Sequence, residues 1–325
     1  MKKFFALILA LLIMAMLLAG CAKEGAPQNG VVRIGGIKGP TSMGMVKLIE
    51  DNENGSTKNK YEFSLAGSAD ELVPKIVKGD LDIAAVPLNL AATLYNNTDG
   101  QIKLLAVNTL GVLYIVERGD TVHSVEDLKG KTIVASGKGS TPEIALRHIL
   151  AGNGLDPDKD VQVEWKSEQT EVLQTMAQNE DSVGLLPQPF VTVAQGQIEG
   201  LNIVIDLTEE WNKLGDGSIL MMGAFAVRKD FAEAHPDQIQ TFLSEYEYSV
   251  MTVNGNPSSA AKLIEKYDIV KAAIAEKAIP YCNIVCITGN EMKTTVEGYF
   301  NVLYAQNSAS IGKKIPAEDF YRINE

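Results

Sequence analysis

Two patterns of apolar residues alternate along the chain from residue 31 onward. Short runs rich in Val, Ile, Leu and Ala are typical of buried strands, and longer segments repeat apolar residues every three or four positions, as amphipathic helices do. The expected strands cover residues 31–37, 61–66, 82–87, 102–108, 111–117, 131–135, 161–165, 182–186, 201–207 and 219–228. Strands that alternate with helices predict βαβ units, and therefore an α/β fold with open, mostly parallel sheets.

Polar residues at helix ends set the boundaries of several segments. Ser68 and Glu71 form a capping-box pair, and Gly79 ends the same helix. Another helix opens at Thr41 or Ser42, where hydroxyl side chains precede Met45. Further helices are expected at residues 88–95, 142–150, 170–178, 189–195, 236–253, 257–267, 270–278 and 291–306. The chain beyond residue 228 is therefore expected to be mostly helical.

The first residues have the order of an export signal. Lys2 and Lys3 precede an uncharged apolar run over residues 4–18, and Leu18-Ala19-Gly20-Cys21 follows it. The run is shorter than the ~20 residues of a membrane-spanning helix. The tetrapeptide resembles the bacterial lipobox, in which the cysteine is acylated. An ordinary signal peptide with an incidental cysteine is the alternative.

This resemblance predicts removal of residues 1–20 and lipidation of Cys21. Residues 21–30 are small, polar and bear Pro and Gly, as a flexible tether does. We therefore expect an extracytoplasmic protein that is lipid-anchored to the cell membrane, at the cell surface or in the periplasm.

Composition narrows the class of protein. The net charge of −12 becomes more negative once Lys2 and Lys3 leave, which argues against nucleic acid or an anionic lipid surface as the main partner. The length after export suffices for about two domains. Cys282 and Cys286 are expected to be free thiols, with a short-range disulfide as the alternative. The three histidines lie in separate segments, so we expect no catalytic residue, no metal site and no cofactor.

Two loops, one in each half of the chain, share the same sequence pattern. Residues 34–42 and 134–142 each contain a strand end, a Gly/Lys loop and hydroxyl residues that open a helix. Such loops present free backbone N–H groups at the carboxyl ends of strands, where ligands bind in open sheets. Ordinary turns with ordinary caps are the alternative. Neither loop has a nucleotide-binding motif.

Each half of the chain has one amide side chain that lies next to prolines after a later strand. Pro87 precedes Asn89, and Gln188 lies between two prolines, which end the strand and start the next helix. Their amides are expected to face the cleft, with exposed loop amides as the alternative. The candidate ligand-binding residues are Lys38, Gly39, Thr41, Ser42, Ser68, Asn89, Thr109, Gly137, Ser140, Thr141 and Gln188.

Three segments resemble the extracytoplasmic solute-binding proteins of ABC transporters. They are Val-Lys-Gly-Asp-Leu-Asp-Ile at 77–83, Ser-Val-Glu-Asp-Leu-Lys-Gly-Lys at 124–131 and Pro-Gln-Pro-Phe-Val-Thr at 187–192. The third resembles the Pro-Glu-Pro-Phe segment of the nitrate, sulfonate, taurine and thiamine-precursor branch. Gln188 stands where that branch commonly has Glu, so a carboxylate is missing and a cationic ligand group fits less well there.

The resemblance implies a type II periplasmic-binding-protein fold with a ligand cleft between two lobes. Residues 30–112 with 224–325 would form the first lobe, residues 113–223 the second, and residues 108–112 and 221–224 the hinge. The implied function is the membrane-tethered substrate-binding component of an ABC importer, which captures a small polar solute by lobe closure and docks, as a monomer, on an ABC permease.

The ligand stays open at this stage. An organic anion such as a sulfonate is favoured by the loops, and a neutral heterocycle such as a thiamine-precursor pyrimidine is the second candidate. We expect a binding protein and not an enzyme; a cofactor-biosynthesis enzyme of the same fold, or a surface adhesin with a degenerate cleft, is the rival.

Overall fold

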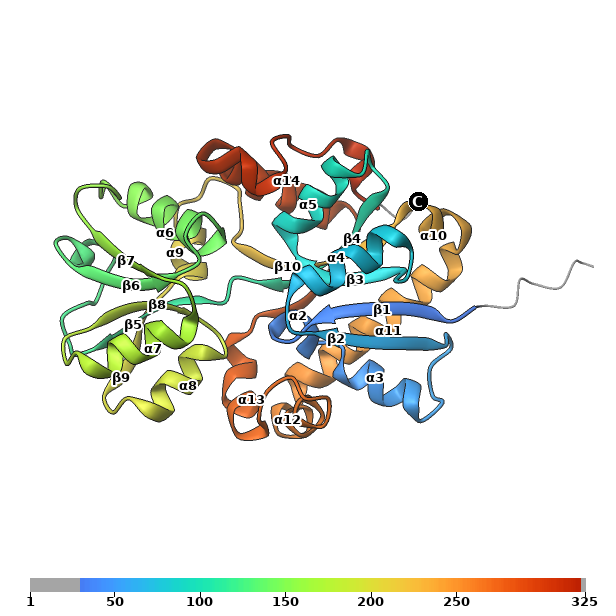
Figure 1. Cartoon of the computed structure of the whole chain (residues 1–325), viewed down its shortest axis with the longest axis horizontal. Coiled ribbons are helices and arrows are strands. Elements are labelled where there is room, and N and C mark those ends of the chain that lie inside the picture. The colour runs from blue at the N-terminus through green and yellow to red at the C-terminus, as the bar shows by residue number, and fades with distance from the viewer. Residues whose placement is uncertain (1–29, 323–325) are drawn as a thin grey trace, which may run out of the picture. The chain divides into compact units, whose positions relative to one another are not determined.

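The strands form two separate sheets, which are called here the first and the second sheet (Figure 1). The computed structural model describes residues 30–322. The first sheet has the order β11-β4-β10-β3-β1-β2, with β1 Val32–Ile37, β2 Tyr61–Ala66, β3 Ile83–Pro87, β4 Ile102–Leu110, β10 Met221–Arg228 and β11 Ile284–Ile287. The second has the order β7-β6-β8-β5-β9, with β5 Leu113–Arg118, β6 Thr132–Ser136, β7 Gln162–Lys166, β8 Val183–Pro187 and β9 Leu201–Asp206.

Both sheets are mixed, which corrects the expectation of mostly parallel sheets. Strand β1 pairs parallel with β2 and β3, and β6 pairs parallel with β7 and β8. In contrast, β10 runs antiparallel to β3 and β4, β11 runs antiparallel to β4, and β5 runs antiparallel to β8 and β9. Strands β5 and β10 are the first strands after the chain passes from one sheet to the other, and each runs antiparallel to both of its neighbours. The α/β class with two sheets is confirmed.

Helices cover both sheets. Those between and after the strands of the first sheet are α2 Pro40–Met43, α3 Val46–Glu53, α4 Ala69–Lys78, α5 Leu88–Asn97, α10 Lys229–Ala234, α11 Pro236–Gly255, α12 Pro257–Lys266, α13 Ala272–Ala278 and α14 Gly289–Asn307. Those of the second sheet are α6 Thr141–Gly152, α7 Gln169–Gln178, α8 Phe190–Gln197 and α9 Leu207–Lys213. None of the helices within residues 30–322 is both long and apolar enough to span a bilayer.

The passages between the sheets are short. Gly111 and Val112 connect β4 to β5, and the chain returns between the end of α9 and the start of β10. The return was expected at residues 221–224, but Met221 already pairs with Leu110 of β4. The loop at Gly215 and Gly217, whose φ angles are positive, therefore carries the return. The assignment of whole lobes to residue ranges stays a prediction.

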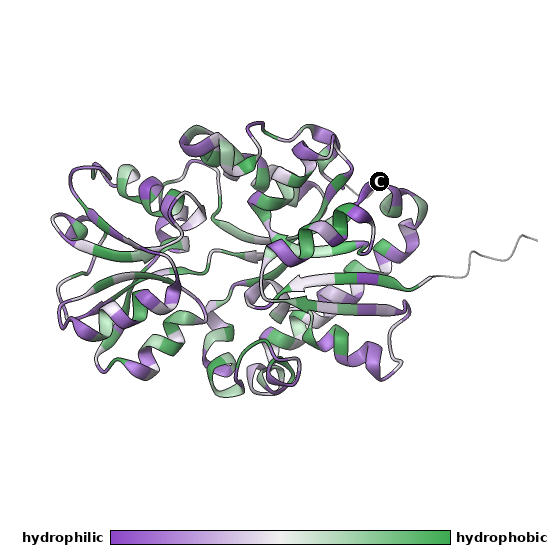
Figure 2. Ribbon diagram, in the orientation of Figure 1, coloured by the Kyte–Doolittle hydropathy of each residue, from purple (hydrophilic) through white to green (hydrophobic). Residues whose placement is uncertain are grey.

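One apolar core is continuous through both sheets. It joins Leu104 of the first sheet to Leu185 of the second, and α14 contributes Tyr299. Trp211 of α9 is fully buried, and its ring centroid lies 5.8 Å from that of Tyr299. Figure 2 shows strands that are largely hydrophobic and helices that carry both polar and apolar residues. The strands have continuous apolar sequences because both faces of each sheet are covered.

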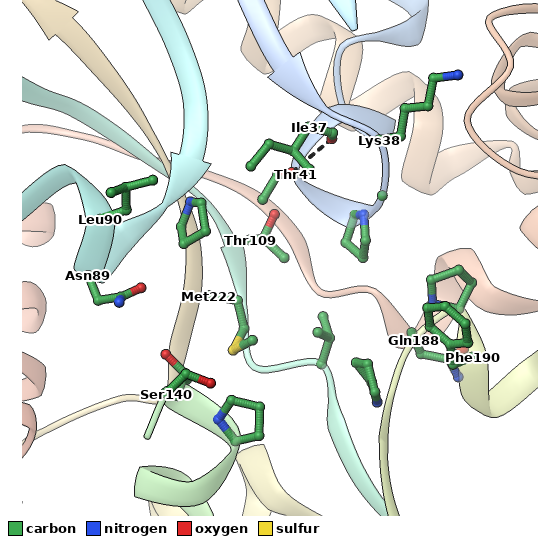
Figure 3. Close-up of a pocket in the computed structure, with 18 residues that line it drawn as sticks. Ile37, Lys38, Thr41, Asn89, Leu90, Thr109, Ser140, Gln188, Phe190 and Met222 are labelled. Carbon is green, nitrogen blue, oxygen red and sulfur yellow. Dashed lines mark hydrogen bonds between the residues drawn. The ribbon is translucent and has the colours of Figure 1, made fainter. Parts of the chain in front are cut away.

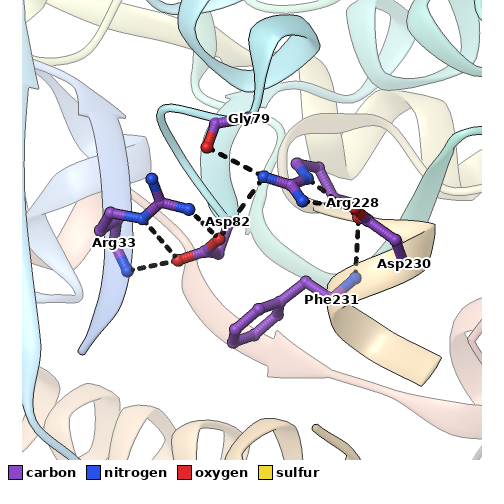
Figure 4. Close-up of polar contacts among 6 residues, drawn as sticks. All are labelled: Arg33, Gly79, Asp82, Arg228, Asp230 and Phe231. Carbon is purple, nitrogen blue, oxygen red and sulfur yellow. Dashed lines mark hydrogen bonds and ion pairs between the residues drawn. The ribbon is translucent and has the colours of Figure 1, made fainter. Parts of the chain in front are cut away.

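The Gly-Asp-Leu-Asp signature has a structural role in this chain (Figure 4). Asp82 is 2% exposed and accepts hydrogen bonds from the Arg33 guanidinium at 2.6 and 3.0 Å and from the Arg33 backbone N–H at 2.9 Å. The Arg228 guanidinium lies 3.7 Å from the same carboxylate and donates to the Gly79 carbonyl. Gly79 has φ +86°, and a Cβ there would lie 2.5 Å from Arg228 Nη1. The signature therefore fastens β1, β3 and β10 together.

Candidate ligand-binding site

A cavity of about 520 Å³ lies at the carboxyl ends of strands from both sheets (Figure 3). The ends of β1, β3, β6 and β8, with the turns and helix starts that follow them, supply most of its wall, and β4, β10 and the β4–β5 connection supply the rest. The lining residues are Ile37, Lys38, Gly39, Pro40, Thr41, Pro87, Asn89, Leu90, Thr109, Val112, Ser140, Thr141, Pro142, Pro187, Gln188, Pro189, Phe190 and Met222. This is the edge at which open α/β sheets bind ligands.

Four helices begin at this cavity, namely α2, α5, α6 and α8. Their N-cap residues are Gly39, Pro87, Ser140 and Pro189, and none of these side chains caps its helix by a hydrogen bond. The backbone N–H groups of a helix's first turn have no partner within the helix and carry its positive dipole end. The first turns of α2 and α6 each lose one N–H to a proline, and Gln188 takes the Thr192 N–H of α8. The remaining first-turn N–H groups leave hydrogen-bond donors at the cavity, which favours an acceptor or an anion.

Most of the candidate residues come together at this cavity. Those that line it are Lys38, Gly39, Thr41, Asn89, Thr109, Ser140, Thr141 and Gln188. Ser42, Ser68 and Gly137 do not. Ser42 is fully buried behind the wall and donates to the Ile37 carbonyl at 2.7 Å. Ser68 caps α4 with Glu71, and Gly137 closes a turn by accepting from Ser140 Oγ at 2.6 Å.

The hydroxyl groups at the cavity already donate to protein acceptors. Thr41 Oγ1 donates to the Ile37 carbonyl at 3.2 Å, and Thr109 Oγ1 donates to Asn108 Oδ1 at 3.0 Å. Asn89 Nδ2 donates to the Ser310 carbonyl at 3.2 Å. These side chains keep oxygen lone pairs as acceptors. The second N–H of Asn89 and donors outside this group remain for a ligand.

Gln188 supplies such a donor. Its side chain is 2% exposed, and Oε1 accepts from Thr192 Oγ1 at 2.9 Å and from the Thr192 backbone N–H at 3.4 Å. Nε2 is buried and has no hydrogen-bond partner in the described chain. A buried donor without an acceptor costs about 1–3 kcal/mol. One residue of the cavity lining therefore carries a buried donor without a partner in the described chain.

Lys38 is the one charged side chain on the wall within residues 30–322. Its ammonium group points away from the other labelled residues and pairs with Asp268 (Figure 3). This hydrogen bond lowers the pKa of the Asp268 carboxyl below its ordinary value. Lys138, at the matching position of the second loop, is exposed and lies outside the lining. The lining thus carries no side-chain charge that lacks a counter-charge.

A second cavity, of about 610 Å³, lies beside Arg33 and Arg228. It sits where β1 begins and β10 ends, away from the carboxyl ends that form the first cavity. Arg228 donates to Asp230 at 2.5 and 2.9 Å, and both guanidinium groups pair with Asp82. Because these charges already have partners, the first cavity is the stronger candidate for an anion.

Sequence reasoning missed the apolar part of the wall. Leu90, Phe190 and Met222 line the cavity but have the composition of core residues. Only their place beside Asn89 and Gln188 could have indicated them. The thiols of Cys282 and Cys286 are free, as expected, and burial raises the pKa of each to about 12. Among the described residues, no three His, Cys, Asp or Glu side chains gather as a metal site would require.

Comparisons with known proteins place the chain in a family. No protein of curated function matches the sequence. An ABC transporter structure from Parabacteroides distasonis is similar at 21% identity and TM-score 0.76, covering 91% of this chain and 99% of that one. The periplasmic aliphatic sulphonate binding protein SsuA from Escherichia coli is similar at 16% identity and TM-score 0.70, covering 86% and 93%. The alkanesulfonate-binding protein SsuA from Xanthomonas axonopodis pv. citri, bound to MOPS, is similar at 16% identity and TM-score 0.62, covering 86% and 94%.

These structures share the fold of this chain. The family model for the periplasmic substrate-binding protein of phosphonate ABC transporters matches residues 53–278, which is more than half of the sequence. The chain therefore belongs to the family of ABC-transporter periplasmic substrate-binding proteins.

Proposed function

We propose that this substrate-binding protein captures a small organic anion, with a sulfonate as the best candidate, and delivers it to an ABC permease while tethered to the membrane. The observation that carries the proposal is the cavity at which four helices begin, three of them of eight or more residues and none capped by the side chain of its N-cap residue. An anion gains both hydrogen bonds and dipole stabilisation at such helix starts. The structural relatives named above as sulfonate-binding proteins support this class of ligand.

The wall favours a ligand with one charged or polar end and an apolar body. Leu90, Phe190, Met222 and several prolines offer apolar surface, and Lys38 is engaged with Asp268. A volume of about 520 Å³ lies within the range of ~300–1,000 Å³ that small-molecule sites occupy. A singly charged head group fits this wall better than a doubly charged one, because no free cationic side chain balances a second charge.

Lobe closure is the mechanism that we propose for capture. The first lobe would comprise residues 30–112 with 224–325, and the second residues 113–223. Loops from both sheets line the one cavity, so a ligand there touches both. A ligand shifts a conformational equilibrium only through contacts that are stronger in one state. We propose that contacts to both sheets are stronger when the lobes are closed, and that closure signals the loaded state to the permease.

The tether rests on the sequence, since Cys21 lies outside the described residues. A membrane anchor keeps the receptor, which we propose acts as a monomer outside the cytoplasm, beside its permease. Cys21→Ser is expected to move the protein from the membrane fraction to the soluble fraction, measured by detergent phase partition. Unchanged partition would contradict lipidation.

A neutral heterocycle of the thiamine-precursor type is the second candidate ligand. It is supported by the paired charge of Lys38 and by the unpartnered donor of Gln188, because a ring nitrogen can accept from an amide without any net charge. Such a ring would also use the apolar wall around Phe190.

Isothermal titration of the full chain in detergent against ethanesulfonate, ethylphosphonate and a hydroxymethylpyrimidine tests the proposal. We expect ethanesulfonate to bind, and Met222→Trp, which fills the cavity, to weaken its binding at least tenfold. Met251→Trp is the matched control, because Met251 is 68% exposed on α11. Equal affinity in the two variants, or no heat with any probe, would contradict the proposal.

A further inference from the structure

We propose that Gln188 determines the charge class of the ligand: its Nε2 donates to an acceptor atom of the ligand, and the cavity rejects a cationic group at this position. The inference rests on the proposed function and deepens it. Among the described residues that line the cavity, the one buried side-chain donor without a partner is this amide nitrogen.

Thr192 fixes the orientation of the Gln188 amide. Its backbone N–H can only donate, and its hydroxyl lies 2.9 Å from Oε1. Rotation of the amide by half a turn would place Nε2 against that N–H, so two donors would face each other. Thr192 is 8% exposed and lies in the first turn of α8. The carboxamide oxygen is therefore committed to Thr192, and the nitrogen is left without a partner in the described chain.

The surroundings of Gln188 favour a ligand atom that accepts a hydrogen bond over a cationic group. Helix α8 begins two residues after it, so the positive dipole end and the first-turn N–H groups lie nearby. None of the residues that line the cavity in the described chain is an acid. A sulfonate, phosphonate or carbonyl oxygen, or a ring nitrogen, would satisfy Nε2, whereas an ammonium group would find no counter-charge.

A carboxylate at this position should reverse the preference. Gln188→Glu has nearly the same shape, still accepts from Thr192, and replaces the donor by a second oxygen with negative charge. It would repel an anion at neutral pH. Protonation of the new carboxyl in acid would restore a donor, so the loss should be reversed as the pH falls. A residue with a merely structural role would not produce this pH dependence.

The test is calorimetric titration of the full chain with ethanesulfonate and, as its cationic counterpart, ethylammonium. We expect the wild type to bind the sulfonate with little change between pH 7.5 and 5, and not to bind ethylammonium. Gln188→Glu should weaken sulfonate binding at least twentyfold at pH 7.5, with recovery toward pH 5. Gln188→Leu should lose affinity without recovering it, and Gln174→Glu, an exposed change on α7, should bind as the wild type does.

Thr192 provides a second line of test as a positioning residue. Thr192→Val removes the hydroxyl that holds Oε1 and should weaken sulfonate binding severalfold, and Thr192→Ser should restore it. Thermal unfolding of each variant separates a folding defect from a binding defect, because the inference requires weaker binding at an unchanged melting temperature.

The outcomes distinguish this inference from the proposed function. Sulfonate binding in the wild type with equal, pH-independent binding in Gln188→Glu would overturn the role of Gln188 and leave the capture of anions intact. Binding of ethylammonium in preference to the sulfonate would overturn the charge class. No binding of ethanesulfonate, ethylphosphonate or the pyrimidine by the wild type would overturn both.

Discussion

The two Gly/Lys loops of the cavity share a sequence device but differ in how they are held. The loop after β1 is fastened to the sheet beneath it: Asn108 of β4 donates to the Thr41 carbonyl at 3.3 Å, and Ser42 donates back to Ile37 at 2.7 Å. The loop after β6 is held mainly by itself. Ser140 donates to the Gly137 carbonyl at 2.6 Å, and the Gly139 N–H donates to Glu143 at 2.6 Å.

A contact from outside the second sheet also reaches the second loop. Asn307, at the end of α14, donates to the Gly139 carbonyl at 3.2 Å, and α14 packs against β4 of the first sheet. The difference teaches that one wall of the cavity is anchored in buried strands, whereas the other depends on local turns and on contacts with α14. We expect the second wall to adjust more readily to a ligand.

The largest expected effect distinguishes the two anchors. Asn108 is fully buried, so Asn108→Ala leaves the Thr41 carbonyl and the Thr109 hydroxyl without their partner. We expect the free energy of unfolding to fall by about 2–3 kcal/mol. Asn307→Ala, its counterpart at the second loop, should cost less than about 0.5 kcal/mol, because that contact is exposed. Urea denaturation measures both, and equal losses would contradict the comparison.

The next largest expected effect is the loss of stability when the glycines of the two loops are replaced by alanine. A Cβ at Gly39 or at Gly139 would have no neighbour within 4 Å, so only the backbone angles differ. Gly39 has φ +139° and ψ −165°, a region that other residues rarely enter, whereas Gly139 has φ +79° in the left-handed region. Gly39→Ala should lower the free energy of unfolding by about 2–3 kcal/mol and Gly139→Ala by about 1 kcal/mol. A larger cost at Gly139 in urea denaturation would show that the second loop is the more rigid.

A smaller effect is expected on ligand affinity from the lysines of the two loops, Lys38 and Lys138. Asp268→Asn releases Lys38, and we expect the affinity for ethanesulfonate to rise about two- to fivefold at low salt, as an exposed ion pair allows. The gain should shrink at high salt because the charges are screened. Lys138→Ala is the matched control and should leave the calorimetric affinity unchanged. An unchanged affinity in Asp268→Asn would mean that Lys38 does not reach the ligand.

The smallest effect is the pH dependence of stability that comes from His148 beside the second sheet. Burial lowers the pKa of His148 on α6 below its ordinary value of about 6.5, against the attraction of Asp216 at 3.1 Å. As the pH falls, His148 therefore takes up a proton in the unfolded chain before it does so in the folded protein. The contribution of His148 to the free energy of unfolding is complete above pH 6.5 and declines as the pH falls from there toward the lower pKa of the folded state. His148→Gln should reduce the fall in melting temperature between pH 7.5 and 5.5. His123→Gln, at an exposed site, should not.

The sequence predicted much of the fold because buried strands and capped helices leave local signals. The strand at residues 61–66 and the capping box at Ser68 agree with the structure, and the prediction of an ABC-transporter solute-binding protein is confirmed. Strand β11 and helices α9 and α10 were not predicted. Strand β11 has only four residues and pairs with β4, which is far from it in the sequence, and such pairing leaves no local pattern.

The site was predictable only in part for a related reason. Loops at strand ends were identified from Gly, Pro and hydroxyl residues, and Asn89 and Gln188 do line one cavity. Whether a hydroxyl faces the ligand or the backbone depends on one side-chain rotation, and Ser42 turned to Ile37. The pairing of Lys38 with Asp268 joins residues far apart in the chain, so no spacing in the sequence indicates it.

The central claim, that an organic anion binds among the four helix starts, is tested most directly by a crystal structure of the protein grown with ethanesulfonate. We predict density for the sulfonate in the cavity, with its oxygens within hydrogen-bond distance of Gln188 Nε2 and of first-turn N–H groups from helices of both sheets. Density for the sulfonate beside Arg33 and Arg228, with the cavity empty, would contradict the account.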